Sequence, residues 1–269
     1  MLKIPEFKTN KELFDFLIEN KASLIAQKCS AIKLADSFGA NAIPVNKQID
    51  GVNKSEGEDN NPNELQVKVV INTTNLFDSH KDVHLPGLWD KSLKENKRIM
   101  HVQEHKSYEF DKIIASGGDL DVSTKNYKWR DLGYDAEGKT QALIFDSNVK
   151  KDRNKQMFNL YKQDLVDNHS VGMRYVKIKM AINDEDYEVE KNLWDANIDK
   201  VINKADAEKS GYMWLVYEAK VIEGSAVPNG SNFVTPTISQ KTNVSDENEN
   251  EKATREGILK FLNIEEDAD

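Results

Sequence analysis

Three side chains in this sequence have the types that nucleophilic catalysis needs: Ser170, His105 and Glu223. A serine hydroxyl is a poor nucleophile at neutral pH until an imidazole accepts its proton, and a carboxylate can fix the tautomer of that imidazole. Such triads are assembled from separate strand edges, so the wide spacing of the three residues is no objection. The alternative is that all three are ordinary polar residues on strands, because spacing by itself does not establish proximity.

The surroundings of Ser170 predict a strand, since Val171, Met173 and Tyr175 alternate with other residues. On that strand we expect Gly172 to leave room for a substrate backbone. Arg174 would share the face of Ser170 and is a candidate for supporting an oxyanion, with a surface salt bridge as the alternative. His169 would point to the opposite face, as a structural or surface residue.

Two groups of histidines raise the question of a metal site. In the first, two aspartates and two histidines alternate and would share one side of an extended segment (Asp78, His80, Asp82 and His84). We favour a solvated loop with turn-forming aspartates there. In the second, His101 and His105 spell a reversed His-x-x-Glu-His motif, which needs a helix, whereas residues 99–102 predict a strand. We therefore predict no metal and no other cofactor, and keep a metal-dependent hydrolase as a third alternative.

Composition limits the classes of partner. The 269 residues carry a net charge of -9, which argues against nucleic acid as the main ligand. One cysteine, Cys29, excludes an internal disulfide and fits a reducing compartment. No apolar run approaches ~18 residues, so we expect no membrane association, and the start of the chain resembles no signal peptide. These features predict a cytosolic protein.

The periodicity of the chain predicts its elements and domains. Residues 1–45 predict a helical N-terminal appendage outside the central core, and the polar residues 46–64 predict a flexible linker. Residues 65–240 contain many short strands with few helices, including an acidic, partly helical insertion at 184–210. Residues 241–269 predict an acidic tail that ends in a short helix. The fold class is therefore α+β and β-dominated, built on a barrel or sandwich.

The order of several short motifs resembles one known family. Asp78…Asp82-Val83…Pro86-Gly87 is followed by His105, by Ser170-Val171-Gly172-Met173 and by Glu223-Gly224-Ser225-Ala226-Val227. This ordered set resembles the prohead, or capsid maturation, proteases of tailed bacteriophages, and it covers roughly residues 65–240. One departure follows Glu223, where the family usually continues Pro-Ala-Asn-Pro and this chain has Pro228-Asn229-Gly230-Ser231-Asn232.

The resemblance implies a β-barrel flanked by helices, similar to herpesvirus assemblin, and a serine endopeptidase that cuts scaffold and capsid precursors inside the assembling shell. It implies Ser170 as nucleophile, His105 as general base and Glu223 as the orienting acid, with Glu218 and His101 as rivals for the last two roles. Residues 65–240 would be the protease domain. We expect location in the host cytoplasm within the procapsid, self-association there and cleavage of the chain itself in its acidic linkers.

A second function remains open from the sequence. The chain could keep the fold without the activity, as a capsid- or scaffold-associated structural protein. The two functions differ in whether Ser170 is needed.

Overall fold

The computed structural model describes residues 4–33, 61–96 and 98–242. Most of the predicted linker and tail, and the helix expected near the C-terminus, lie outside the described residues. The strands are β1 (Ile32–Lys33), β2 (Glu64–Thr73), β3 (Asp82–His84), β4 (Met100–Gln103), β5 (Ile113–Ser116), β6 (Leu120–Lys128), β7 (Lys139–Lys150), β8 (His169–Ile182), β9 (Tyr212–Ala226) and β10 (Thr237–Thr242). The α-helices are α1 (Asn10–Glu19), α2 (Lys21–Ser30), α3 (Asp90–Glu95), α4 (Lys155–Lys162), α5 (Glu188–Asp195) and α6 (Lys204–Ser210).

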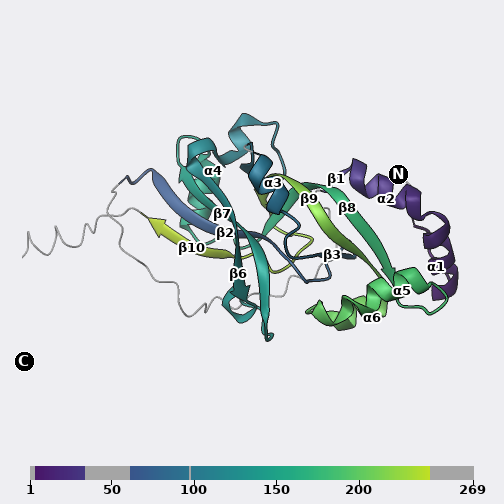
Figure 1. Cartoon of the computed structure of the whole chain (residues 1–269). Helices are drawn as coiled ribbons and strands as arrows, with labels where there is room; N and C mark the ends of the chain where they lie inside the picture. Colours follow the sequence, from purple (N-terminus) through teal and green to yellow (C-terminus); the bar gives the residue numbers. More distant parts are fainter. Residues whose placement is uncertain (1–3, 34–60, 97, 243–269) are drawn as a thin grey trace, which may run out of the picture.

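The strands form two sheets (Figure 1). One has the order β1-β8-β9-β4-β5, with β3 also paired to β9, and the other has the order β10-β2-β7-β6. Both β3 and β4 run parallel to β9, whereas β8 and β9 are antiparallel along nearly their whole length. The α+β class with more strand than helix is confirmed, but within the described residues the sheets do not close into a barrel.

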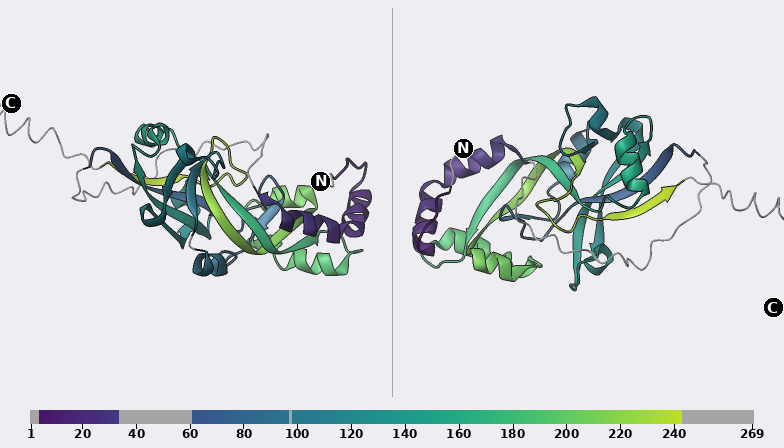
Figure 2. Two further views of the ribbon diagram at one scale, coloured as in Figure 1. Left: turned by 90° about the horizontal axis from the view of Figure 1, so that it is seen from above. Right: turned by 180° about the vertical axis from the view of Figure 1, so that it is seen from behind.

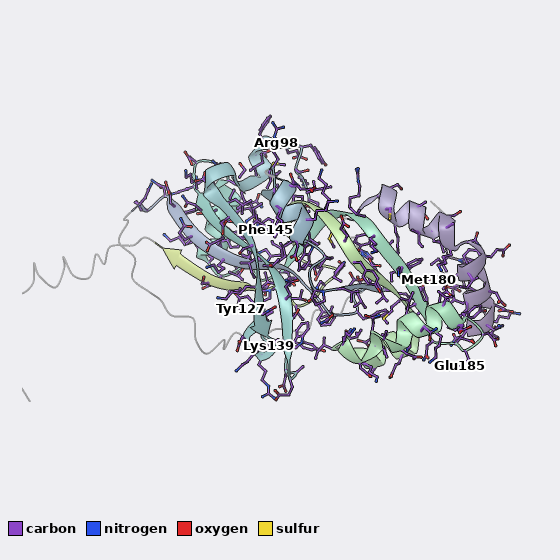
Figure 3. All side chains as sticks on the ribbon, viewed as in Figure 1. Arg98, Tyr127, Lys139, Phe145, Met180 and Glu185 are labelled. Carbon is purple, nitrogen blue, oxygen red and sulfur yellow. The ribbon has the colours of Figure 1, made fainter. Side chains whose placement is uncertain are left out.

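The two sheets pack closely where β9 passes β7. A Cβ at Gly224 would overlap the Phe145 ring and the end of Ile71, so only glycine admits these side chains. Phe145 is fully buried, and Figure 3 marks its position. The strand β9 continues through Gly224 to Ala226. Because side chains alternate along a strand, Glu223 and Ser225 then face away from this contact.

The N-terminal helices pack on the six-stranded sheet and not apart from it. α1 opens with a capping box between Thr9 and Glu12. Phe14 and Leu17 of α1 and Leu24 of α2 are buried in the same cluster as the strands. We expected these helices outside the central core, but their apolar side chains are buried in it, and α2 packs against β8.

A second apolar cluster lies at the far end of β8 and β9. The predicted acidic insertion is helical, as expected, and forms α5 and α6 (Figures 1 and 2). Its buried side chains, among them Trp194 and Ile198, pack against Met213 and Leu215 of β9. Among the described residues, no helix has the length and apolar character needed to cross a membrane.

Candidate active site

The centre of the candidate site is a hydrogen bond between His105 and Glu223. The Nδ1 atom of His105 lies 2.6 Å from Oε1 of Glu223, and the two side chains are only 8% and 2% exposed. A carboxylate accepts, so Nδ1 carries the proton and Nε2 is the basic nitrogen of the ring. This is the arrangement in which an acid orients a general base.

Strand register brings Ser170 to the same face as this pair. Ser170 is opposite Ser225, and Gly172 is opposite Glu223, across the antiparallel strands β8 and β9. Residues directly opposite each other project to the same face, with Cβ atoms about 5 Å apart. Ser170, itself buried, therefore lies two residue pairs along the sheet from the glutamate that holds His105, on the same face.

Gly172 makes room for the glutamate. A Cβ on residue 172 would overlap Oε1, Cδ and Cγ of Glu223. The carboxylate thus lies against β8 in the space that a side chain on residue 172 would need. We expected Gly172 to admit a substrate backbone, and in the described structure the Glu223 carboxylate occupies that space instead.

Ser225 is a site residue whose role the sequence did not suggest. Its hydroxyl accepts the backbone N–H of His105 at 2.7 Å and donates to the carbonyl of Val102 at 3.2 Å. It therefore ties the turn after β4 to β9. The sequence could have indicated this role by spacing, because Ser225 lies two residues beyond Glu223 and side chains two apart on a strand share a face.

The turn that carries His105 has a strained backbone. Glu104 and His105 have φ values of 51° and 59°, both in the left-handed region that disfavours side chains with a Cβ. Such conformations cost about 1–3 kcal/mol each and persist where neighbouring contacts hold them. The N–H of Glu104 donates to Ala226 and that of His105 to Ser225, so β9 holds both residues in place.

Burial sets the electrostatics of the carboxylate. Desolvation raises the pKa of Glu223, and the hydrogen bond from His105 opposes that rise. The second oxygen, Oε2, has no hydrogen-bond partner among the described residues. A buried carboxylate with one satisfied oxygen gains most when its partner imidazole becomes cationic, as it does when it accepts a proton.

The rival residues are placed elsewhere. Glu218 is partly exposed and lies 3.4 Å from Lys91. His101 faces the contact between the sheets, on the side of β4 opposite the His105–Glu223 pair. Arg174 is exposed, four residues or roughly 13 Å along the strand from Ser170. The geometry favours Glu223 and His105 over their rivals, and it gives no support to an oxyanion role for Arg174.

A hydrogen-bonded chain is buried behind the site. The carbonyl of Thr235 lies 2.9 Å from Nδ1 of His169, so this nitrogen donates and Nε2 accepts from the Tyr161 hydroxyl at 3.0 Å. The Tyr161 oxygen can then accept from Nε2 of His101 at 3.2 Å, which leaves Nδ1 of His101 to accept from Ser147 at 2.9 Å. With these donors and acceptors both imidazoles are neutral, His169 protonated at Nδ1 and His101 at Nε2.

Burial also keeps these imidazoles neutral. It lowers the pKa of His169 to about 4, and burial together with the nearby His169 holds the pKa of His101 well below its usual value. His169 was predicted to be a structural or surface residue on the face opposite Ser170. Its complete burial within this hydrogen-bond network fits the structural role.

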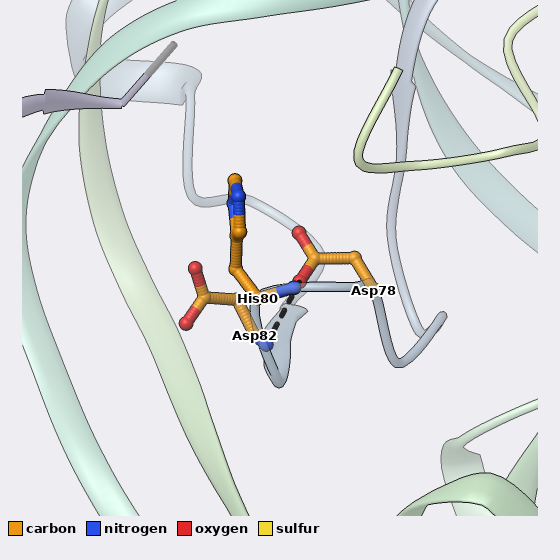
Figure 4. Close-up of side chains that lie close together, drawn as sticks. All are labelled: Asp78, His80 and Asp82. Carbon is orange, nitrogen blue, oxygen red and sulfur yellow. Dashed lines mark hydrogen bonds between the residues drawn. The ribbon is translucent and has the colours of Figure 1, made fainter. Parts of the chain in front are cut away.

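The Asp78, His80 and Asp82 side chains come together in a turn (Figure 4). Their ligand atoms lie within 4.8 Å of one another. Oδ1 of Asp78 accepts the backbone N–H groups of His80 and Asp82, as turn-forming aspartates do. Asp82 also receives Lys28 at 2.6 Å and the Tyr175 hydroxyl at 2.6 Å. A metal ion would compete with the Lys28 ammonium, so the cluster fits a buried ion pair better.

Comparison of the chain with protein-family models, with curated proteins and with solved structures finds no match.

Proposed function

We propose that this chain is a serine endopeptidase in which Ser170 is the nucleophile, His105 the general base and Glu223 the orienting acid. The observation that carries the proposal is the 2.6 Å hydrogen bond between His105 and Glu223, on the face of the sheet that also bears Ser170. Base and acid are 118 positions apart in the sequence, and the pairing of β8 with β9 sets Ser170 on the same face as the acid. They occupy the roles that the resemblance to prohead proteases implies.

The chemistry follows from these positions. The Ser170 oxygen forms a bond to the scissile carbonyl carbon while its proton moves to Nε2 of His105. The imidazolium is stabilised by Glu223 and gives that proton to the departing amine, so the peptide bond breaks and an acyl-enzyme remains. Water then attacks the ester, His105 takes its proton and returns it to Ser170, and the acid product leaves.

The biological setting is part of the same proposal. The substrates would be the capsid and scaffold precursors of a tailed bacteriophage, cut within the procapsid, and the chain itself. The resemblance covers β8 and β9, which carry Ser170 and Glu223, and the turn after β4, which carries His105. The α+β class with two sheets is compatible with a fold related to assemblin, and the helices α1 to α3 would be its flanking helices.

The test compares wild type with Ser170→Ala beside the cognate capsid precursor, followed by intact-mass analysis of both proteins. We expect wild type to trim the precursor or itself, and the variant to leave both intact. Thermal unfolding of the variant serves as the folding control. Identical uncut masses, with a precursor that still assembles, would favour the non-catalytic structural role instead.

A further inference from the structure

Exposed apolar side chains gather in the loops next to the candidate site. Among the described residues, six large apolar side chains are exposed: Ile4, Tyr108, Phe110, Leu165, Val176 and Val189. Tyr108 and Phe110 are 80% and 91% exposed and follow His105 by three and five residues. Leu165 is 62% exposed and precedes Ser170 by five. Three of these six residues, Tyr108, Phe110 and Leu165, therefore lie within five positions in sequence of His105 or Ser170.

Strand pairing places both loops at one end of the sheet. Gln103, the last residue of β4, and His169, the first of β8, both pair with Ala226 from opposite sides of β9. The 104–112 loop leaves the sheet just beyond Gln103, and the 163–168 segment enters it just before His169. Both therefore border the end of the sheet that carries Ser170.

The 104–112 loop is ordered by its own contacts, which makes the exposure of its rings informative. Glu104 pairs with Lys106 at 3.0 Å, and Asp111 pairs with Lys112 at 3.2 Å. Backbone hydrogen bonds from Lys106 to Gln103 and from Lys112 to Glu109 close successive turns. The charges of the loop are thus largely satisfied within it. The two aromatic rings are more exposed than any charged side chain in these two ion pairs.

Leu165 has a partial local explanation. Asp164 adopts a left-handed conformation, and the N–H of Leu165 bonds to the carbonyl of Leu160, as at many helix ends where an apolar residue touches the last turn. The aromatic residues have no such explanation. Exposed apolar groups beside a concentration of polar function commonly mark an interaction surface.

We propose that Tyr108 and Phe110 form the recognition surface for an extended, unfolded polypeptide segment with large apolar side chains, which they hold beside His105. The identity of this occupant rests on the proposed peptidase function, because the loop that begins near His105 borders the end of the sheet that carries Ser170, where a substrate polypeptide would bind. Aromatic rings offer a large apolar area with little conformational entropy to lose on binding. Leu165 borders the same end of the sheet from the other side.

The test measures binding separately from cleavage. Full-length Ser170→Ala protein is titrated with fluorescently labelled β-casein, an unfolded polypeptide rich in apolar residues, and fluorescence anisotropy is recorded. Adding Tyr108→Ser and Phe110→Ser should weaken binding at least about tenfold, since burying one large apolar side chain changes affinity by that order. The matched control adds Val176→Ser and Val189→Ser, which remove exposed apolar groups elsewhere, and should change affinity less than about twofold.

Cleavage then separates this inference from the proposed function. Wild type is incubated with a mixture of peptides, and the residues around each cut are identified by mass spectrometry. We expect large apolar residues at a fixed distance from the cut, and loss of that preference in the Tyr108→Ser/Phe110→Ser protein. Equal casein affinity in both double variants overturns the recognition surface. Weaker binding in the aromatic variant alone, with no cleavage by wild type, sustains the surface and overturns the peptidase.

Discussion

Gly172 and Glu223 face each other across β8 and β9, and the carboxylate of Glu223 occupies the space that a side chain on residue 172 would need. The glycine therefore serves the acid of the proposed triad and not a bound substrate. This relationship makes the position of Glu223, and through it that of His105, depend on the absence of one methyl group.

Gly172→Ala should displace the Glu223 carboxylate from His105. We expect a loss of peptidase activity of about 100-fold or more, and a decrease in the free energy of unfolding of about 1–3 kcal/mol from overpacking. The measurements are precursor cleavage rates and chemical denaturation. Gly118→Ala is the matched control, because a Cβ there meets nothing within 4 Å, and it should leave both unchanged. Normal cleavage by Gly172→Ala would show that the acid is not needed where it lies.

Glu223→Gln should separate stability from activity. Burial raises the pKa of Glu223 above its unfolded value, so its contribution to stability falls as the pH rises from the unfolded pKa through the folded one. A neutral amide at this position does not have to be ionised in the buried site. We therefore expect the variant to have a free energy of unfolding at neutral pH equal to or greater than that of wild type. Activity should fall by about 100- to 10,000-fold, because the amide neither fixes the tautomer of His105 nor stabilises its cation.

The control for this variant is Glu218→Gln, which changes a partly exposed carboxylate on the same strand. It should retain activity within about twofold, since exposed ion pairs contribute little. Kinetic constants for both variants, with chemical denaturation at neutral pH, show which of the two glutamates is the orienting acid. Full activity in Glu223→Gln combined with a large loss in Glu218→Gln would reverse the assignment of the acid.

The sequence predicted the elements well and the contacts between them less well. Local periodicity located β8 and the N-terminal helices α1 and α2, because burial of one face leaves a period in the residues themselves. The choice between Glu218 and Glu223 was not local, since it depends on the register of β8 against β9, which is shifted at three places. Two further features could not be read from local sequence. The sheets stay open because of which strands pair, and Leu17 is buried because distant segments of the chain pack around it.

Leu17→Ala tests whether the N-terminal helices belong to the core. Leu17 is fully buried against the six-stranded sheet, and removing a buried side chain of this size costs about 2–5 kcal/mol. We expect the whole described fold to lose that stability in a single transition by chemical denaturation. Val189→Ala, at a position 66% exposed, should change it by less than about 0.5 kcal/mol. A separate early transition confined to the helices would restore the view of them as an appendage.

The buried hydrogen-bond network of His101, Tyr161 and His169 should make the fold sensitive to acid. The pKa of His169 is lowered by burial to about 4, against about 6.5 in the unfolded chain, so the unfolded state binds a proton that the folded state refuses between these values. Stability supplied by the neutral imidazole is complete above pH ~6.5 and is lost as the pH falls toward 4. The loss from His169 alone is about 3 kcal/mol.

Denaturation of wild type and His169→Gln at a series of pH values measures this loss. Wild type should show a steep decrease in stability over that interval, and His169→Gln a shallower one from a lower starting value, because glutamine does not titrate. Tyr161→Phe removes the hydroxyl that joins the two rings and should also lower stability at neutral pH, since it leaves buried nitrogen atoms of His101 and His169 without their shared partner. Equal pH dependence in wild type and His169→Gln would contradict a neutral, buried imidazole at that position.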